Sequence, residues 1–468
     1  MKGASQQQTI AAFRLISSSD PSAVILDKTS KYSKCWMNKF GHDNPTVVLR
    51  PKTLPQLQAF LSFANRNEIP LVPQSGNTGL VGGSVPNAPD EHVLSMDRFT
   101  ATPICLNKEE QIMTLDAGVV LQDAIDFAKQ HNFLFPLSIG SSGSCLIGGN
   151  VATNAGGIYF SRFGSLRENV VGLEAVLPSG EILNMMKCVL PKDSVGFDLR
   201  SLFIGSEGTL GVISKVAVKV HTMPTSRELA ILACDSFDNV RKINEKISQL
   251  SPGLVSAVEL MDSSVLEMVR ARLGKTICFD ITKGHYYIAL EFMGFDEMSD
   301  RAQLEALLAS ALDEGYICDG IIAQSLTHLN EIWATRESCG PAVNSYKRNW
   351  KYDLSLPLKD WEAVVAHVQE KVEKHNGRLA VWGHLGDRNI HMNVVCDDEN
   401  CVDLGQLIEE NLITLTLDLG GSISAEHGVG LAKQKYVKAA LGEAVVAKMN
   451  LIRECFDPCG ILNRGKLV

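Results

Sequence analysis

Two patterns of hydrophobic and polar positions divide the chain near residue 222. From Gly76 to Gly211, glycine is dense among short Val, Ile and Leu segments, which is typical of short strands joined by turns. One such segment, VISKVAVKV, predicts a strand that ends ahead of Pro224. From residue 226 to residue 375, glycine is rarer and helical periodicity prevails. We therefore predict an N-terminal segment at residues 1–41, a first domain at 42–222, a mixed α/β domain at 223–419 and a short helical C-terminal segment at 420–468.

Two stretches of the second half alternate as strands do. In WKYDLSLP, which begins at Trp350, the polar residues share one predicted face, namely Lys351, Asp353 and Ser355. In NIHMNVV, the polar residues again fall on one face, namely Asn389, His391 and Asn393. Upstream, Ile332, Trp333 and Arg336 are spaced as on one helix, which we expect to stop at Gly340–Pro341.

The composition narrows the classes of function. The chain has 468 residues, of which 21% are charged and 45% hydrophobic, as in globular proteins. Its net charge of −9 argues against a nucleic-acid partner, and no apolar run approaches the roughly 20 residues that span a bilayer. An anionic substrate would therefore need a local cluster of cationic side chains or a metal ion.

The cysteines and the N-terminus bear on the compartment. Twelve cysteines are scattered between Cys35 and Cys459 without a C-x-x-C pair, so we expect reduced thiols in an intracellular compartment. The N-terminus carries Lys2 and Arg14 and no acidic residue before Asp20. This is compatible with a mitochondrial presequence and equally with an ordinary frayed terminus of a cytoplasmic protein.

Three glycine-rich loops suggest an anion-binding site. They read PQSGNTGLVGGS (residues 73–84), IGSSGSCLIGGN (139–150, continuing into ATNAGG at 152–157) and GSEGTLG (205–211). Glycines at this density let the backbone approach a ligand closely, so that successive N–H groups converge on an anion such as a pyrophosphate. The loops match neither G-x-G-x-x-G at the start of a helix nor G-x-x-x-x-G-K-[ST]. The alternative is that they are only turns between strands.

Two histidines and a glutamate are candidate metal ligands. His384 precedes a Leu-Gly-Asp turn and His391 lies in the predicted strand that follows, while Glu426 stands in the later string SAEHG. Two imidazoles and a carboxylate suit zinc or another first-row divalent ion with open positions for a substrate. One alternative is that the two histidines are unrelated. Another is a non-haem iron site, which would not explain the glycine-rich loops of the first half.

Two cations are candidate contacts for an anionic substrate. Arg336 offers a planar fork for a carboxylate, and Lys351 offers a point charge. The alternative is a surface arginine on a helix and a lysine paired with Asp353 on its own strand.

The glycine loops, together with FIGSEGTLG at Phe203–Gly211, resemble the PCMH-type FAD-binding domain of the vanillyl-alcohol-oxidase superfamily, and most closely its D-2-hydroxy-acid dehydrogenases. The resemblance extends from about residue 47 to residue 466 and implies an α+β fold, in which a PCMH-type FAD-binding domain precedes a mixed α/β substrate (cap) domain. Some members attach FAD through a histidine in the first loop; Ser75–Thr78 stands here, which implies non-covalent FAD. The FAD contacts implied are Pro73, Gly76, Asn77, Thr78, Gly79, Gly82, Gly83, Ser84, Gly140, Gly143, Ser144, Gly148, Gly149, Asn150, Thr153, Asn154, Gly156, Gly157, Glu207, Gly208 and Asn463.

The same resemblance implies roles for the second half. GHLGDRNIH and SAEHGVG are similar to the metal-binding motifs of these dehydrogenases, which implies His384, His391 and Glu426 as ligands and His427 as the general base. If Glu426 and His427 are extended, their side chains point in opposite directions. The substrate contacts implied are Arg336, Lys351 and Asn393.

The string KYDLSLP is similar to the D-2-hydroxyglutarate branch of the family rather than to the D-lactate branch. Three positions depart from that branch: Gly340 stands where a substrate-contacting Thr is usual, Arg388 replaces a Gly, and Arg464 replaces a Pro. The first departure removes one expected contact to the distal carboxylate. The second predicts an arginine that either crowds the metal loop or points outward.

We therefore expect the oxidation of a D-2-hydroxy acid, most specifically of D-2-hydroxyglutarate to 2-oxoglutarate, with hydride transfer to flavin N5 and zinc as the metal. We expect an electron acceptor such as an electron-transfer flavoprotein, and a homodimer as the assembly. One alternative is a D-lactate or broad-specificity D-2-hydroxy-acid dehydrogenase. Alternatives of other classes are a catalytically silent flavin-binding interaction protein and, more remotely, a metallohydrolase.

Overall fold

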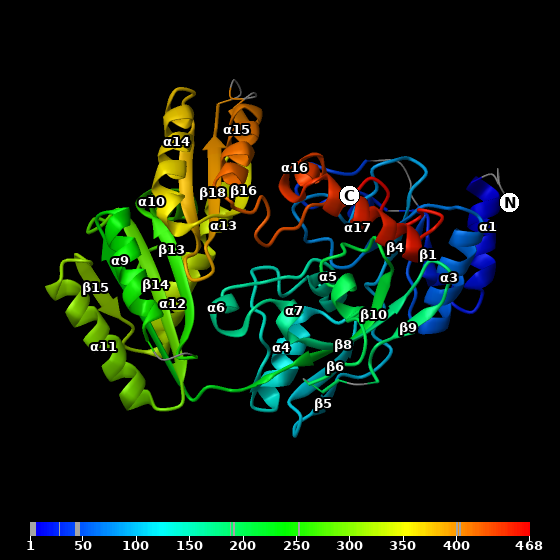
Figure 1. Cartoon of the computed structure of the whole chain (residues 1–468), viewed down its shortest axis with the longest axis horizontal. Helices are drawn as coiled ribbons and strands as arrows, with labels where there is room; N and C mark the ends of the chain where they lie inside the picture. Colours follow the sequence, from blue (N-terminus) through cyan, green and yellow to red (C-terminus); the bar gives the residue numbers. More distant parts are fainter. Residues whose placement is uncertain are drawn as a thin grey trace. The chain divides into compact units, whose positions relative to one another are not determined.

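The computed structural model describes residues 6–27, 29–42, 47–187, 189–190, 192–250, 253–398, 401 and 404–468. The chain forms two compact units (Figure 1). Unit 1 comprises Met1–Gly157, Gly164–Met223 and Glu426–Val468, so both chain ends belong to it. Unit 2 comprises Ile158–Phe163 and Pro224–Ala425.

Unit 1 is built on two main sheets. In the first, the strands lie in the order β1 (Val24–Ile25), β2 (Val48–Leu49), β4 (His92–Ser95), β3 (Leu71–Gln74), with β4 parallel to both β2 and β3. In the second, the order is β5 (Cys105–Asn107), β6 (Ile112–Asp116), β10 (Val212–Lys219), β8 (Val170–Val176), β9 (Ile182–Asn184), and all neighbours are antiparallel. A short pair joins β7 (Phe133–Leu134) to β11 (His221–Thr222).

The helices of unit 1 are α1 (Gln6–Ile16), α2 (Ser30–Ser33), α3 (Leu54–Arg66), α4 (Leu121–Gln130), α5 (Ile147–Ala152), α7 (Leu166–Asn169), α8 (Arg200–Phe203), α16 (Val437–Leu441) and α17 (Glu443–Phe456). Helix α3 shows why such segments form. Thr53 caps it by accepting from the Gln56 N–H, and a proline occupies its first turn. Its buried residues recur at helical spacing and face the core, namely Leu57, Phe60, Leu61 and Ala64.

Unit 2 is built on one seven-stranded antiparallel sheet. Its strands lie in the order β15 (Asp319–Ile322), β12 (Ser226–Cys234), β14 (Tyr286–Gly294), β13 (Val255–Asp262), β17 (Arg378–His384), β18 (Asn389–Cys396), β16 (Arg348–Ser355). Its helices are α6 (Phe160–Phe163), α9 (Phe237–Ser248), α10 (Ser263–Leu273), α11 (Glu297–Asp313), α12 (Leu326–Glu337), α13 (Cys339–Asn344), α14 (Trp361–Glu373) and α15 (Leu404–Asp418).

One face of this sheet packs against helices α10, α12 and α13. Helices α10, α12 and α13 share a hydrophobic core with the sheet residues Met261, Tyr287 and Ala380. Helices α9, α11, α14 and α15 also pack against strands of the sheet (Figure 1). The strand residues on the face beneath α12 alternate with buried apolar residues on the opposite face, because successive side chains of a strand point to opposite sides.

Several local predictions can be compared with the structure. The predicted strand at VISKVAVKV is β10, and the two alternating stretches are β16 and β18, so these predictions are confirmed. The predicted end of the helix that carries Arg336 is wrong by a few residues. Helix α12 ends at Glu337, and Gly340 and Pro341 lie in the separate helix α13, where a proline in the first turn disturbs no hydrogen bond.

The cysteine prediction needs one correction. Cys396 and Cys401 form a disulfide, whereas we expected reduced thiols throughout. The remaining described cysteines are free thiols. Of the helices in the described part of the chain, none combines the length and the apolar content that crossing a bilayer requires.

Candidate functional site

The first two glycine loops of unit 1 pack against each other, backbone to backbone. A Cβ at Gly76 would lie 2.4 Å from the carbonyl oxygen of Ser144, and a Cβ at Gly149 would lie 2.7 Å from the Cβ of Ser75. Both distances are far below van der Waals contact. These glycines are therefore required by the close approach of the two loops and not only by turn geometry.

The third loop joins the second through backbone hydrogen bonds. The N–H groups of Gly205 and Glu207 donate to the carbonyl oxygens of Val151 and Ala152, at 3.1 and 2.8 Å. The Asn463 side chain donates to the Glu207 carbonyl oxygen at 2.6 Å, which adds the C-terminal segment to the same assembly. All three predicted loops and Asn463 thus meet in unit 1.

The assembled loops keep an open side that suits a cofactor. Cβ positions built at Gly79, Gly140 and Gly143 meet no atom within 4 Å, so their backbone borders open space. The buried Oδ1 of Asn150 has no hydrogen-bond partner among the described residues. Backbone that borders open space, in loops that also hold an unsatisfied polar atom, fits a ligand held by backbone N–H groups, as FAD would be.

Some side chains predicted to touch the cofactor also shape the loops. Asn77 donates to the carbonyl oxygens of Lys31 and Lys34, at 3.1 and 2.8 Å, and accepts from the Ser84 hydroxyl at 2.8 Å. Asn77 also has a φ of +53°, a conformation that asparagine tolerates better than most residues. The role of its side chain in the structure is therefore to fix the first loop.

Glu207 links the third loop to the segment that follows His427. Its two carboxylate oxygens accept from the N–H groups of Val429 and Gly430, each at 2.7 Å. Burial raises the pKa of this carboxyl, and the two N–H groups lower it in part by stabilising the charged form. Glu207 was predicted as a flavin contact, and the structure gives its side chain this second task.

Lys466 is a buried residue of this region that the sequence analysis missed. Its ammonium group donates to the carbonyl oxygens of Gly83 and Val85 and to Oδ1 of Asn463, at 3.2, 2.7 and 3.1 Å. Burial lowers its pKa to about 8. Lys466 thus ties the C-terminus to the first glycine loop, and no motif marked it because a lysine near a terminus is usually exposed.

In unit 2, the register of the sheet brings the predicted site residues onto one face. His391 of β18 lies opposite Trp382 of β17 on one side and Asp353 of β16 on the other. Asn393 lies opposite Lys351. Because directly opposed residues of antiparallel strands point to the same side, these side chains form one polar patch, and the predicted shared faces are confirmed.

His384 and Arg336 meet at a buried glutamate. Nδ1 of His384 lies 2.8 Å from Oε1 of Glu259, the residue opposite it on β13. Nη2 of Arg336, from α12, donates to Oε2 of the same carboxylate at 2.5 Å. Glu259 is 1% exposed, and its only sequence signal was an acidic residue inside an apolar strand, which we did not single out.

Trp382 connects the other members of the patch. The Arg336 guanidinium lies 4.6 Å from its ring centre, and its indole N–H donates to Oδ1 of Asn393 at 3.0 Å. Its ring is also 3.8 Å from the Cβ position of Gly340. An aromatic ring therefore occupies the space beside the position where a Thr was expected.

The donor set of the patch fits a divalent metal. The ring centres of His384 and His391 lie 5.4 Å apart, and Nδ1 of His391 lies 3.8 Å from Oδ1 of Asp353. The same Oδ1 accepts from the Asn389 side chain at 2.9 Å. Imidazoles and carboxylates bind zinc at about 2.0–2.2 Å, so two buried rings at this spacing can coordinate one ion between them.

Glu426 and His427 open the last segment of unit 1. Their side chains approach each other, with Nε2 of His427 3.5 Å from Oε1 of Glu426. Residues 425–427 form a bend rather than a strand. The condition for opposed side chains, an extended Glu426–His427 pair, is therefore not met, because the bend brings both groups to one side.

Two of the sequence departures can now be located. Arg388 lies in the turn between β17 and β18 with a φ of +66°, where glycine is favoured, and its side chain is exposed, so it points outward. Arg464 pairs with Asp90 at 2.6 Å on the surface of unit 1. Within unit 2, the exposed Arg388 side chain therefore leaves the polar patch clear.

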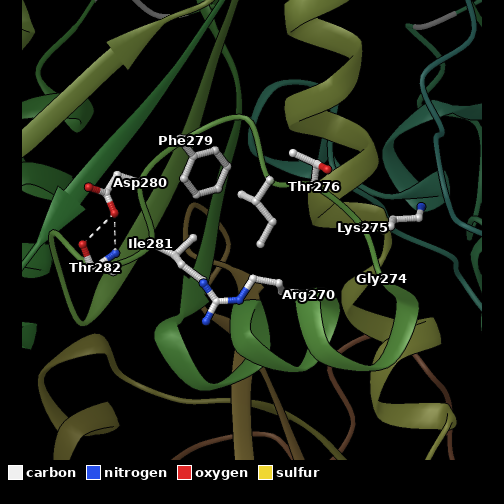
Figure 2. Close-up of a pocket in the computed structure, with 9 residues that line it drawn as sticks. Arg270, Gly274, Lys275, Thr276, Phe279, Asp280, Ile281 and Thr282 are labelled. Atoms are coloured by element: carbon white, nitrogen blue, oxygen red, sulfur yellow. Dashed lines mark hydrogen bonds between the residues drawn. The ribbon is translucent and has the colours of Figure 1, made fainter.

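A separate pocket of about 410 Å³ lies in unit 2 beside the end of α10 (Figure 2). Arg270, Lys275 and Phe279 are among its lining residues, and Asp280 bonds to Thr282 at its edge. None of the residues predicted for metal or substrate is among the described residues that line it. We therefore place the candidate site at the polar patch and not at this pocket.

Two family models match most of the chain. Residues 45–186 match the family model described as FAD binding domain, and residues 223–467 match that of FAD linked oxidases, C-terminal domain. The chain belongs to the family of FAD-linked oxidases, which confirms the expected family and the expected cofactor.

The curated relatives of the chain include dehydrogenases of 2-hydroxy acids. The chain is 37% identical to the mitochondrial D-2-hydroxyglutarate dehydrogenase of Danio rerio, over 90% of this chain and 78% of that protein. It is 33% identical to a putative mitochondrial D-lactate dehydrogenase of Schizosaccharomyces pombe, over 99% of this chain and 90% of that protein. A solved structure of p-cresol methylhydroxylase shares the fold of this chain, with a TM-score of 0.81 and 14% identity over 99% of this chain and 97% of the other. This shared fold confirms the expected α+β, PCMH-type architecture.

Proposed function

We propose that this protein oxidises D-2-hydroxyglutarate to 2-oxoglutarate, with FAD as the electron acceptor in the active site and a divalent ion, zinc, beside the substrate. The observation that carries the proposal is the polar patch of unit 2, where two imidazoles, Lys351 and Asn393 share one face of a sheet and Arg336 of α12 reaches the same face through Glu259. Cations and metal ligands on one face suit a small dianion, in a protein whose net charge is −9.

The proposed metal ligands are His384, His391 and Glu426. Ser422 pairs with Ser355 of β16 through two backbone hydrogen bonds of 2.8 and 3.0 Å. Glu426 follows Ser422 by four residues, which span at most about 14 Å of extended chain. Chain connectivity therefore limits the distance between Glu426 and Ser422, and Asp353 is a further carboxylate beside His391.

In the proposed reaction, Arg336 and Lys351 bind the substrate carboxylates and Asn393 donates to the substrate near the metal. His427 accepts the hydroxyl proton while the C2 hydrogen leaves with its electron pair, which converts the alcohol carbon to a carbonyl. Bound FAD supplies the hydride acceptor, at N5, and the bound ion supplies a Lewis acid that lowers the pKa of the hydroxyl.

Gly340 supports a second candidate within the same chemistry. It offers no side chain to a distal carboxylate, and the Trp382 ring lies beside it. A D-lactate or broad-specificity D-2-hydroxy-acid dehydrogenase would need no distal contact. A catalytically silent flavin protein is disfavoured, because every candidate ligand and the base are retained.

The remaining expectations form part of the proposal. FAD is held without a covalent bond, because Ser75–Thr78 provides no histidine. Relatives named as mitochondrial support a mitochondrial location. An electron-transfer flavoprotein as the next acceptor and a homodimer as the assembly complete it.

The test is a comparison of steady-state rates with an artificial electron acceptor. D-2-hydroxyglutarate should have a kcat/KM well above those of D-lactate and L-2-hydroxyglutarate. Treatment with a chelator should abolish turnover and leave FAD bound, and added zinc should restore it. Comparable kcat/KM values for D-lactate would favour the second candidate, and an unchanged rate after chelation would remove the metal from the mechanism.

A further inference from the structure

Glu259 receives hydrogen bonds from two residues with different proposed tasks. Its Oε1 lies 2.8 Å from Nδ1 of His384, and its Oε2 accepts from Nη2 of Arg336 at 2.5 Å. Each of these three residues is at most 8% exposed. The contact with His384 is built into the fold, because the register of β13 and β17 places the two residues directly opposite each other.

The chemistry of this contact fixes the form of the imidazole. Oε1 of Glu259 offers Nδ1 of His384 an acceptor, so this contact favours the tautomer that carries the proton on Nδ1. In a neutral imidazole, Nε2 is then the nitrogen with the lone pair that a metal requires. Carboxylate–histidine–metal arrangements of this kind orient the ring and raise the basicity of the ligand.

The other oxygen of Glu259 acts on the proposed substrate contact. Glu259 holds one end of the Arg336 guanidinium, and the Trp382 ring lies 4.6 Å from its central carbon. Nε of Arg336 is buried and has no hydrogen-bond partner among the described residues. The guanidinium is thus held in place while it keeps N–H groups for a further acceptor.

We propose that Glu259 is a positioning residue that couples the metal site to the substrate site: it sets the tautomer of His384 for the metal and the orientation of Arg336 for a substrate carboxylate. The inference rests on the proposed function, since it assumes the roles of His384 and Arg336 given there. Glu259 itself touches neither the substrate nor the metal.

The sheet provides a matched control in Glu291 of the neighbouring strand β14. Glu291 is also fully buried, and it also accepts from α12, through the Trp333 indole N–H at 2.9 Å. Its other partners are Arg227 at 2.7 Å and Ser256 at 2.8 Å, and none of them is a proposed ligand. Substitution of Glu291 therefore reports the cost of neutralising a buried carboxylate that holds α12.

The experiment compares Glu259→Gln with Glu291→Gln in the FAD-loaded protein. Zinc affinity is measured by competition with a chromophoric chelator. We expect a loss of about 10- to 100-fold for Glu259→Gln, as for other carboxylates behind a histidine ligand, and a change below about threefold for Glu291→Gln. The KM for D-2-hydroxyglutarate should rise for Glu259→Gln, and the FAD content of both variants should match the wild type. Equal losses of zinc affinity in both variants overturn the proposal.

A second measurement needs no variant and covers the case in which Glu259→Gln does not fold. Nitrogen chemical shifts of labelled histidine in the metal-free wild type report the tautomer of His384. The proposal requires the proton on Nδ1, and a proton on Nε2 overturns it. Wild-type protein that binds no zinc contradicts the proposed function itself, whereas wild-type protein that binds zinc no better than Glu259→Gln contradicts only the role of Glu259.

Discussion

Glu207 gives the sharpest prediction about how the flavin loops and the proposed base are connected. The change is Glu207→Gln, which keeps the size of the side chain and removes its charge. In the wild type, both carboxylate oxygens accept from the partly buried turn after His427, through the N–H groups of Val429 and Gly430. In the variant, one oxygen becomes an NH₂ group that faces an N–H donor.

The expected magnitude follows from that mismatch. A buried N–H group left without an acceptor costs about 1–3 kcal/mol. Replacing the carboxylate also removes the cost of burying its charge, which raises the pKa of Glu207, so the net effect on global stability is smaller than that figure. The local cost appears as disorder of the turn, and a tenfold change in rate corresponds to about 1.4 kcal/mol. We therefore expect kcat to fall roughly 10- to 100-fold.

The assay is steady-state turnover per bound flavin, with the flavin content measured separately. We expect an unchanged FAD-to-protein ratio in Glu207→Gln and a lowered kcat. The matched control is Glu174→Gln on β8, another buried carboxylate of unit 1, whose side chain accepts from Ser214 at 2.9 Å and from Asn184 at 3.1 Å. Loss of FAD from Glu207→Gln with a normal kcat per bound flavin would refute the reasoning, since the side chain would then act on the cofactor.

Four further results are expected. Gly76→Ala should destabilise unit 1, because its Cβ would lie 2.4 Å from a carbonyl oxygen. Gly143→Ala should leave the melting temperature unchanged and weaken FAD binding, because its Cβ would enter the open side of the loops. Thermal denaturation and flavin titration distinguish these two effects. Arg388→Gly should raise the free energy of unfolding by ~0.5–1 kcal/mol by relieving a φ of +66°, with unchanged zinc affinity, and a destabilised variant would contradict this. The buried Lys466 has a pKa of about 8 in the folded state, below that of an exposed lysine, so the folded state binds fewer protons between pH 8 and about 10.5 and stability should rise with pH across that window. Lys466→Met should lack this rise in chemical denaturation at pH 7 and pH 10, and a parallel response of both proteins would disprove the assignment.

The sequence could predict those parts of the site that depend on local pattern. The period-two alternation around Lys351 and His391 identified the faces of β16 and β18, because a strand buried on both sides still separates its polar residues onto one face. The glycine loops were equally visible, since close backbone approach excludes other residues and leaves a dense run of glycine.

The parts that escaped prediction depend on contacts between distant segments. Glu259 precedes His384 by 125 positions, and Glu207 precedes Gly430 by 223, so no local periodicity reports either contact. Both are single acidic residues whose importance arises only when the sheet register or the loop packing brings a partner opposite them. The bend at Glu426–His427 was also missed, because the string SAEHG is compatible with an extended segment and with a turn.

The central claim is that one molecule of flavin in this protein takes two electrons from a D-2-hydroxy acid. Anaerobic titration of the purified yellow protein with D-2-hydroxyglutarate, followed by the visible absorbance of oxidised flavin, measures this without any external acceptor. We predict complete bleaching at one equivalent of substrate per flavin, with 2-oxoglutarate as the product and no bleaching after removal of the metal. A flavin spectrum that stays oxidised with D-2-hydroxyglutarate and with every other D-2-hydroxy acid tried would contradict it.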